Sequence, residues 1–413
     1  MTETIHAAES PAVPPEFPIA RGCPFAPPDE YRRIREEQPI TKVRLPDGRE
    51  AWALSRLADV RALLTDHRFS ANRRDPRFPA LTAGGAIRLP VDERSILTLD
   101  APEHGPARRA VLGEFTVRRM EALRPRIQQI VDEHIDAMLA GPPHHGKRSA
   151  DLVQALSLPV PSLVICELLG VPYEDHEYFQ RHSAKTLDQA IGPEERQASV
   201  DAIIAYLDEL ITAKEASPGD DLFGRQIVKR REEGTYRHSA MVALAFLLLI
   251  AGHETTANMI SLGALMLMEN PDQLAAIRSD PGKTLDAVEE MLRYFTIVDT
   301  FVARFCVEDA EIGGVTIRAG EGVLALGHIA NRDPEHFADP ETFDIERGAR
   351  HHVAFGFGFH QCLGQNLARL ELQIVFDTLF HRIPELKPAA GVDDLPFKDD
   401  ASIYGLHRLP VTW

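Results

Sequence analysis

The sequence predicts a mainly α-helical fold with a small β portion, and three observations support this prediction. First, apolar residues recur three and four positions apart, as in amphipathic helices, over residues 55–64, 124–139, 161–169, 198–213 and 285–295. Second, residues 241–251 are almost entirely apolar, which indicates a buried helix because spanning a bilayer takes about 20 residues. Third, short segments of β-like composition lie at 41–45, 51–54, 311–317 and 322–326.

The chain organisation indicates one large domain preceded by an arm. The first 18 of the 413 residues are rich in Pro and Ala, and we expect them to form a flexible arm. The Pro- and Gly-rich stretches at 141–148 and 216–221 are surface connections too short to link domains. We therefore expect residues 19–413 to form a single domain.

Charge and cysteine usage exclude several classes of protein. The formal net charge is -17, from 62 acidic and 45 basic side chains, which argues against a nucleic-acid or anionic-membrane binder. The N-terminus carries no signal peptide or membrane anchor pattern, so we expect a cytoplasmic protein. Four cysteines lie far apart without a CxxC pair, which fits neither a disulfide framework nor a zinc cluster; they are Cys23, Cys166, Cys306 and Cys362.

The strongest local signal is FGFGFHQCLG, residues 355–364, followed at once by an amphipathic segment. A cysteine just before a helix receives free backbone N–H groups and the positive end of the helix dipole, which favour the metal-binding thiolate. Gly358 and Gly364 remove side chains where the backbone turns sharply or approaches a flat ligand. Alternatively, Cys362 is a nucleophile with His360 or His352 as its base.

This segment resembles the cysteine loop of the cytochrome P450 family, F-x-x-G-x-[H/R]-x-C-x-G. Every fixed position of that pattern is matched, by Phe355, Gly358, His360, Cys362 and Gly364. The resemblance implies the P450 fold, with haem b between a long oxygen-binding helix and the helix after the cysteine loop. It also implies that Cys362 is the axial ligand of the haem iron.

A second motif, AGHETT at residues 251–256, ends the predicted apolar helix. His253 and Glu254 suggest a zinc-protease HExxH helix, but the position of the second His is Ala257, so the zinc interpretation fails. In the P450 family this place holds an acid-alcohol pair after two small residues, which bends the helix to make room for dioxygen. The resemblance therefore assigns oxygen activation to Glu254 and Thr255, after Ala251 and Gly252.

Further positions match the family in their order along the chain. Glu290 and Arg293 lie at i and i+3 of one helix, where the family has a buried structural ion pair. Arginine and histidine side chains suit the haem propionates. The residues that match the propionate contacts of the family are His104, Arg108, Arg304 and His360.

The resemblance covers residues 17–413 and implies a monooxygenase that hydroxylates or epoxidises an apolar small molecule with O2, in natural-product tailoring or the oxidation of foreign compounds. NAD(P)H would supply electrons through a separate ferredoxin and ferredoxin reductase, because no flavin module follows Cys362. We expect a monomer. Its donor would dock on a local basic face formed by Arg108, Arg109, Arg118, Arg119, Arg347 and Arg350.

Two rival functions remain open. A peroxide-driven peroxygenase typically lacks the acid-alcohol pair, which is present here. A haem carrier or sensor would use the same ligand without an oxygen-handling pair. By analogy, we expect the substrate pocket to be lined by 80–97, 178–190, Ile297, Val298, Ile403 and Tyr404, and to take a bulky ligand such as a macrolide, terpenoid or steroid-like molecule.

Overall fold

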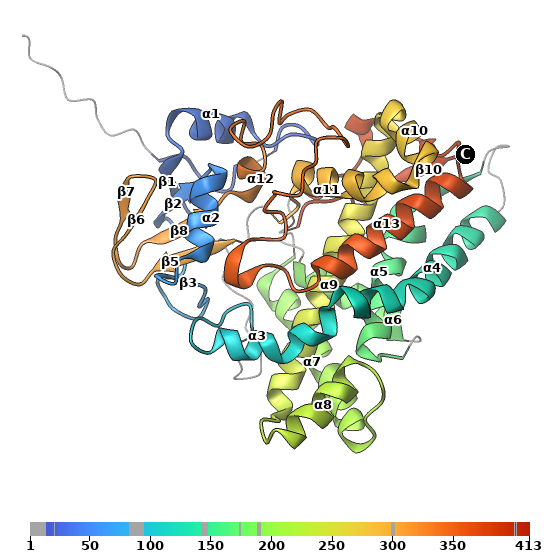
Figure 1. Cartoon of the computed structure of the whole chain (residues 1–413), viewed down its shortest axis with the longest axis horizontal. Helices are drawn as coiled ribbons and strands as arrows, with labels where there is room; N and C mark the ends of the chain where they lie inside the picture. The colour runs from blue at the N-terminus through green and yellow to red at the C-terminus, as the bar shows by residue number, and fades with distance from the viewer. Residues whose placement is uncertain are drawn as a thin grey trace, which may run out of the picture.

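The computed structural model describes residues 14–19, 21–81, 95–141, 148–172, 175–187, 191–298, 302–399, 401 and 403–413. Long helices fill one side of the molecule and a small sheet lies on the other (Figure 1). The predicted fold class is therefore confirmed.

The described helices are α1 Asp29–Glu37, α2 Leu57–Thr65, α3 His104–Leu112, α4 Val117–Ala140, α5 Pro159–Leu169, α6 His176–Leu187, α7 Pro193–Ala216, α8 Leu222–Glu232, α9 His238–Glu269, α10 Pro271–Ser279, α11 Thr284–Phe295, α12 Gly327–Ala330 and α13 Gln365–Arg382. Helix α4 begins seven residues before its predicted start at residue 124. Its N-terminus is fixed by Thr116, whose side chain accepts a hydrogen bond from the Arg119 N–H.

Helix α9 is the longest of these helices, with 32 residues. It crosses the whole helical part of the molecule, behind α13 in Figure 1. By length and composition it could cross a membrane, but 67% of its most apolar stretch is buried inside the protein. The motif at 251–256 lies in the middle of this helix and not at its end, so that part of the prediction is wrong. The helix continues because most of its apolar residues pack against α5, α7 and α13.

The main sheet has five strands in the order β1-β2-β8-β5-β3. Strand β2 pairs with β8 in parallel and the other neighbours are antiparallel. The strands are β1 Ile40–Arg44, β2 Glu50–Leu54, β3 Phe69–Ser70, β5 Ala303–Cys306 and β8 Gly322–Ala325. A second sheet joins β4 Ser149–Asp151, β10 Pro410–Thr412 and β9 Lys387–Pro388, in the order β4-β10-β9.

The segment predicted as one β piece at 311–317 is a hairpin of two strands. These strands are β6 Ala310–Ile312 and β7 Val315–Ile317. Gly313 and Gly314 form the turn between them with φ of 55° and 79°, a conformation that favours glycine. The Gly-Gly pair is therefore the sequence signal of this hairpin.

The predicted arm at 1–18 lies largely outside the described residues, and its described end is not flexible. Phe17 is 3% exposed and packs against Tyr31, and its N–H donates to the Arg44 carbonyl at 2.8 Å. This segment therefore adds to the edge of the main sheet beside β1, and the predicted arm is too long.

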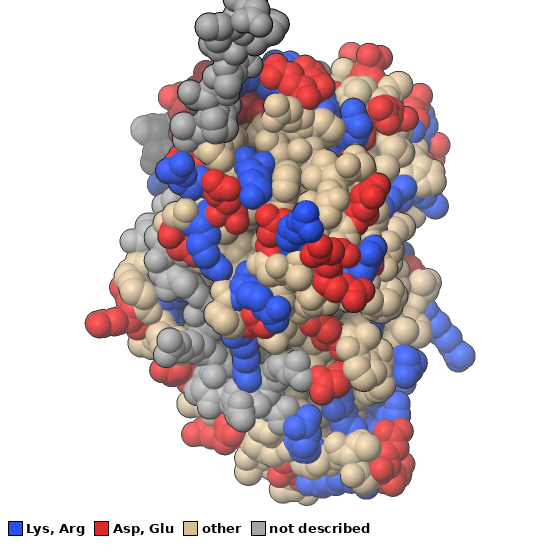
Figure 2. Space-filling view, turned by 90° about the vertical axis from the view of Figure 1, so that its left-hand side faces the viewer, with Lys and Arg blue, Asp and Glu red and all other residues tan. Residues whose placement is uncertain are grey.

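Charges of both signs alternate on the face of the molecule that carries the sheet (Figure 2). Many of them are paired, as in Arg318 with Asp309 at 3.0 Å and Lys42 with Glu321 at 3.3 Å. The acidic excess of the chain is thus not gathered on this face.

Candidate active site

The cysteine loop is a closed turn that presents Cys362 at the start of α13. The Cys362 N–H donates to the Phe355 carbonyl at 2.8 Å, and the Gly356 N–H donates to the Val353 carbonyl at 2.8 Å. Gly358 has a φ of 67°, and a Cβ added there would lie 2.5 Å from the Leu64 carbonyl oxygen. Only glycine fits at this position, where the loop contacts α2.

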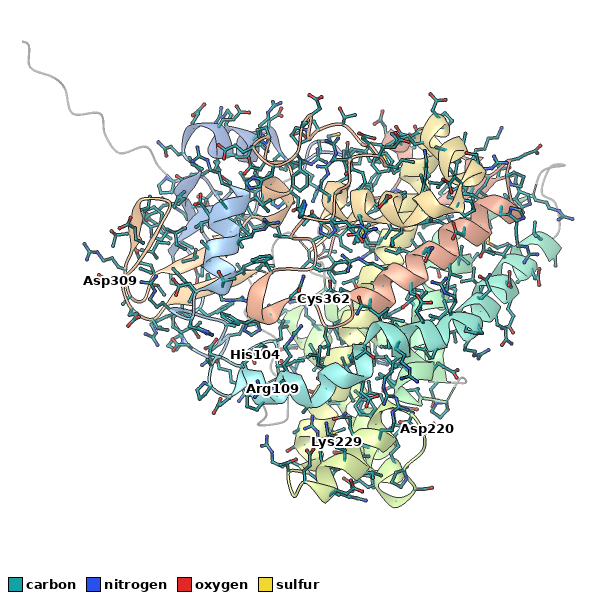
Figure 3. All side chains as sticks on the ribbon, in the orientation of Figure 1. His104, Arg109, Asp220, Lys229, Asp309 and Cys362 are labelled. Atoms are coloured by element: carbon teal, nitrogen blue, oxygen red, sulfur yellow. The ribbon has the colours of Figure 1, made fainter. Side chains whose placement is uncertain are left out.

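Cys362 lies near the middle of the view in Figure 3, and its side chain is surrounded by protein but not sealed from solvent. Burial raises the pKa of the thiol above its ordinary value, although the Gly364 N–H and the charges of Arg108 and Arg369 act in the opposite direction. The N–H groups at the start of α13 thus favour thiolate as expected, but burial opposes them. A bound metal cation is what deprotonates such a thiol.

One face of α9 carries side chains that remain accessible. Between Met241 and Leu267 most side chains are buried, and the residues that remain accessible recur at helical spacing; they are Leu247, Ile250, Ala251, Gly252 and Thr255. The Thr255 hydroxyl donates to the Ala251 carbonyl at 2.7 Å, one turn earlier. This bond keeps the hydroxyl oxygen free to accept a further hydrogen bond on the accessible face.

Glu254 does not share this accessible face, because its side chain is 4% exposed. Its Oε2 lies 3.1 Å from the Lys398 Nζ, which also donates to the Asn258 Oδ1 at 3.0 Å. Burial would raise the pKa of Glu254, but Lys398, His253 and His407 together outweigh it and the pKa is lowered. The acid is therefore ionised and held by a residue near the C-terminus.

Basic groups crowd together beside the cysteine loop. The rings of His104 and His360 lie 4.1 Å apart, and the Arg108 Nη2 donates to the Gln361 carbonyl at 2.5 Å. Burial, with the charges of Arg304, His104 and Arg108, lowers the pKa of His360 to about 3. Burial, with the charge of Arg73, lowers the pKa of Arg304 to about 10. The structure thus brings the four predicted propionate contacts together.

This cluster has the chemistry of a site for a dianion. Cations repel one another here, and the carboxylate of Asp100 is the compensating charge that acts on both His104 and Arg304. Within the described part of the chain, the Nε2 of His104 is buried without a hydrogen-bond partner. A Cβ added at Gly364 would meet no atom within 4 Å. The accessible sulfur, the open side of Gly364 and the unbalanced cations fit haem with its two propionates.

The predicted ion pair of Glu290 and Arg293 forms a fully buried network. Arg293 Nε donates to the Glu290 Oε2 at 2.7 Å, and both side chains are at most 1% exposed. Arg347, which we expected on the docking face, instead donates to the Glu290 Oε1 at 3.2 Å and has a side chain only 9% exposed. That expectation is wrong, because Arg347 fixes the loop before the cysteine segment.

Three residues of this region lacked a sequence signal. Arg73 acts on Arg304 from the loop after β3, and Lys398 reaches Glu254 across 144 residues of sequence. Arg369 lies within the helix pattern of α13, yet its charge acts on Cys362. Among the described residues, no group of three His, Cys, Asp or Glu side chains could hold a metal ion.

Comparisons with known proteins agree with this geometry. The family model described as Cytochrome P450 matches residues 192–400. Pentalenic acid synthase of Streptomyces avermitilis is 48% identical over 404 residues, which are 97% of this chain and 98% of the relative. The chain belongs to the cytochrome P450 family.

Solved structures extend the likeness to the whole fold. Cytochrome P450 MoxA from Nonomuraea recticatena has a TM-score of 0.90 and 57% identity, covering 96% of this chain and 98% of its own. The mycinamicin VIII C21 methyl hydroxylase MycCI from Micromonospora griseorubida, bound to mycinamicin VIII, has a TM-score of 0.90 and 40% identity, covering 97% and 100%. This cytochrome P450 is a monooxygenase that uses haem iron and O2 to oxidise a small molecule.

Proposed function

We propose that this cytochrome P450 hydroxylates or epoxidises a bulky apolar natural product, with Cys362 as the axial ligand of haem b. The observation that carries the proposal is the accessible Cys362 sulfur beside the charges of Arg108 and Arg304 and the neutral rings of His104 and His360. When bound, the haem supplies activation of dioxygen, which electron donation from a thiolate sulfur favours. A Cys362 nucleophile is disfavoured, because burial lowers the pKa of His360 to about 3 and leaves it a poor base.

Thr255 and Glu254 divide the handling of protons between them. The Thr255 hydroxyl donates a hydrogen bond to the Ala251 carbonyl, so its oxygen can accept a hydrogen bond from an ordered water on the accessible face of α9. Glu254 is ionised and can take up a proton from water. Its carboxylate reaches that face only after leaving Lys398, which makes this ion pair a control point for proton supply.

The substrate class is inferred from the relatives and from the residues near the site. One relative is a pentalenic acid synthase and another a vitamin D3 dihydroxylase of Streptomyces griseolus, 44% identical over 400 residues. Ile297 and Ile403 are apolar and buried. The Tyr404 hydroxyl donates a hydrogen bond to the Pro24 carbonyl at 2.9 Å. This turn therefore offers apolar contacts, which suit a macrolide or terpenoid. Most of the predicted lining at 80–97 lies outside the described residues.

Electrons would come from NAD(P)H through a ferredoxin and its reductase. Arg109 and Arg118 are exposed on α3 and α4, and near them Leu112 and Val117 are 45% and 62% exposed. Exposed arginines around apolar side chains suit an acidic protein partner. Arg119 and Arg350 are partly neutralised by Glu114 and Asp286 and contribute less. We propose this face as the docking site of a monomeric, cytoplasmic enzyme.

Carbon monoxide spectroscopy of the reduced holoprotein tests the ligand. The wild type should show the red-shifted Soret band of thiolate ligation, and a Cys362→Ala variant should lose it. Cys23→Ala, which removes an exposed free thiol, should keep the band. A Cys362→Ala variant that retained the band would overturn the assignment.

Product analysis tests the reaction. Substrates are first found by their perturbation of the haem spectrum, and turnover then uses ¹⁸O₂ with a ferredoxin and reductase. We expect one labelled oxygen atom per product molecule. Turnover that succeeds with hydrogen peroxide but not with the reductase would favour a peroxygenase, and tight binding without product would favour a carrier.

A further inference from the structure

Glu289 is a buried carboxylate next to Glu290 that the proposed function does not use. It lies on α11 and is 3% exposed. Arg369 on α13 binds it with two hydrogen bonds, from Nε to Oε1 at 2.5 Å and from Nη2 to Oε2 at 3.0 Å. The His352 Nε2 lies 3.1 Å from the same Oε2. These bonds and charges lower the pKa of Glu289 to about 2 against the effect of burial, so the group is ionised.

His352 contributes to this cluster through both ring nitrogens. Its Nδ1 accepts a hydrogen bond from the Ala354 N–H at 3.1 Å. Its Nε2 lies 3.1 Å from the Glu289 Oε2. Arg369 provides the guanidinium charge that binds the carboxylate with two hydrogen bonds.

Arg369 connects the pair to the cysteine loop. It lies seven residues after Cys362, in the second turn of α13, and its side chain is 23% exposed. Its guanidinium carbon is 4.6 Å from the centre of the Phe355 ring. The Phe355 carbonyl in turn accepts the Cys362 N–H at 2.8 Å. The cation is thus held against the residue whose backbone fixes the sulfur.

We infer that Glu289 is a positioning residue that tunes the haem reduction potential, by holding Arg369 against Phe355 and offsetting its charge near Cys362. The inference rests on the proposed ligation by Cys362. A cation near the ligand sulfur stabilises the ferrous state, which has one more negative charge, and a carboxylate does the opposite. The balance between Arg369 and Glu289 therefore sets part of the potential.

Two single variants of the holoprotein test this balance, because they must shift the potential in opposite directions. Glu289→Gln leaves the Arg369 charge unopposed and should raise the potential. Arg369→Gln leaves the Glu289 carboxylate unopposed and should lower it. The double variant should return towards the wild type, and Arg369→Lys, which keeps the charge, should stay close to it. Potentials are measured by spectroelectrochemical titration without substrate.

A matched control lies on the same helix. Asp286→Asn also changes a carboxylate to an amide on α11, but its partner Arg350 is 64% exposed and 3.4 Å away, so we expect no shift. Shifts of the same sign in both single variants, or no shift in Arg369→Gln, would overturn the inference and leave a purely structural role. The carbon monoxide band separates the two proposals. A wild type without the red-shifted band would contradict ligation by Cys362 and hence the proposed function. Unchanged potentials in variants that keep the band would contradict only this inference.

Discussion

The hydroxyl of Thr255 is the single group whose removal best separates oxygen chemistry from haem binding. Thr255→Ala should keep the haem spectrum and substrate binding, because the hydroxyl donates to a carbonyl of its own helix, that of Ala251. Product formed per NAD(P)H should fall by about tenfold or more, with a matching rise in hydrogen peroxide, since positioned proton donors contribute about 100-fold or more. Both are measured in one turnover assay.

Thr256→Ala is the control for that experiment. This neighbouring side chain is 5% exposed, and its hydroxyl bonds the Gly252 carbonyl at 3.4 Å, away from the accessible face. It should leave the coupling unchanged. If Thr255→Ala were as tightly coupled as the wild type, Thr255 would have no part in proton handling.

The ion pair of Lys398 with Glu254 should make the free energy of unfolding depend on pH. Lys398→Met leaves a buried carboxylate without its cation, which costs about 3–5 kcal/mol of unfolding free energy at neutral pH. In the wild type the folded pKa of Glu254 is lowered, so its contribution is present above its ordinary pKa and is lost as pH falls. The variant loses the largest of the effects that lower this pKa, so burial dominates and protonation relieves the penalty.

The measured difference in unfolding free energy between wild type and Lys398→Met should therefore be largest at neutral pH and shrink towards pH 4.5, the ordinary pKa of a glutamate. Urea unfolding followed by circular dichroism gives this difference. Lys398→Met combined with Glu254→Gln serves as control and should lose the pH dependence. A difference that stayed constant with pH would show that Glu254 is not the group concerned.

At the scale of elements, α9, α11 and α13 meet at Gly263. A Cβ there would lie 2.5 Å from the Phe376 Cζ and 2.7 Å from the Met291 Sδ. Overpacking costs about 1–3 kcal/mol, and the gain in helix propensity recovers about 1 kcal/mol. Gly263→Ala should lower the free energy of unfolding by up to about 2 kcal/mol, measured by urea denaturation.

Gly113→Ala provides the matched comparison, because its Cβ meets no atom within 4 Å. Its effect should stay within about 0.5 kcal/mol. Equal effects at the two positions would mean that the three helices can separate at little cost.

The elements differ in how well the sequence predicts them. Periodicity located most long helices, and the motif around Cys362 located the loop, because both signals are local. The start of α4 and the end of α9 were missed, since Thr116 fixes the first and packing of α9 against other helices determines the second. Arg73 and Lys398 were missed because their partners are distant in sequence. The order of motifs predicted a role for Glu254. It did not predict that the Glu254 carboxylate is buried in an ion pair with Lys398 and does not share the accessible face of Thr255.

At the scale of the whole molecule, a net charge of -17 opposes the approach of an acidic ferredoxin. Reduction should therefore depend on the local arginines, and its rate should fall several-fold from low to 0.5 M salt, where the Debye length is below about 10 Å. Arg109→Glu should slow reduction at low salt and weaken its salt dependence. Stopped-flow reduction by a ferredoxin measures both effects.

Arg318→Glu is the control, because this exposed residue follows β7, outside α3 and α4, and pairs with Asp309. It should change neither the rate nor its salt dependence. Equal slowing by Arg109→Glu and Arg318→Glu would mean that only net charge matters and that α3 is not the docking face.

The parallel pairing of β2 with β8 also bears on how the protein is made. Ala51 pairs with Gly322, so roughly 270 residues must leave the ribosome before β2 gains its second neighbour. At about 5–20 residues per second, that edge stays open for about 15–50 s of translation. Cys362 emerges later still. During this interval the nascent chain therefore has one open edge on β2 and no haem ligand. Slow growth at low temperature and an ample supply of chaperones should accordingly raise the yield of intact protein more than added haem does.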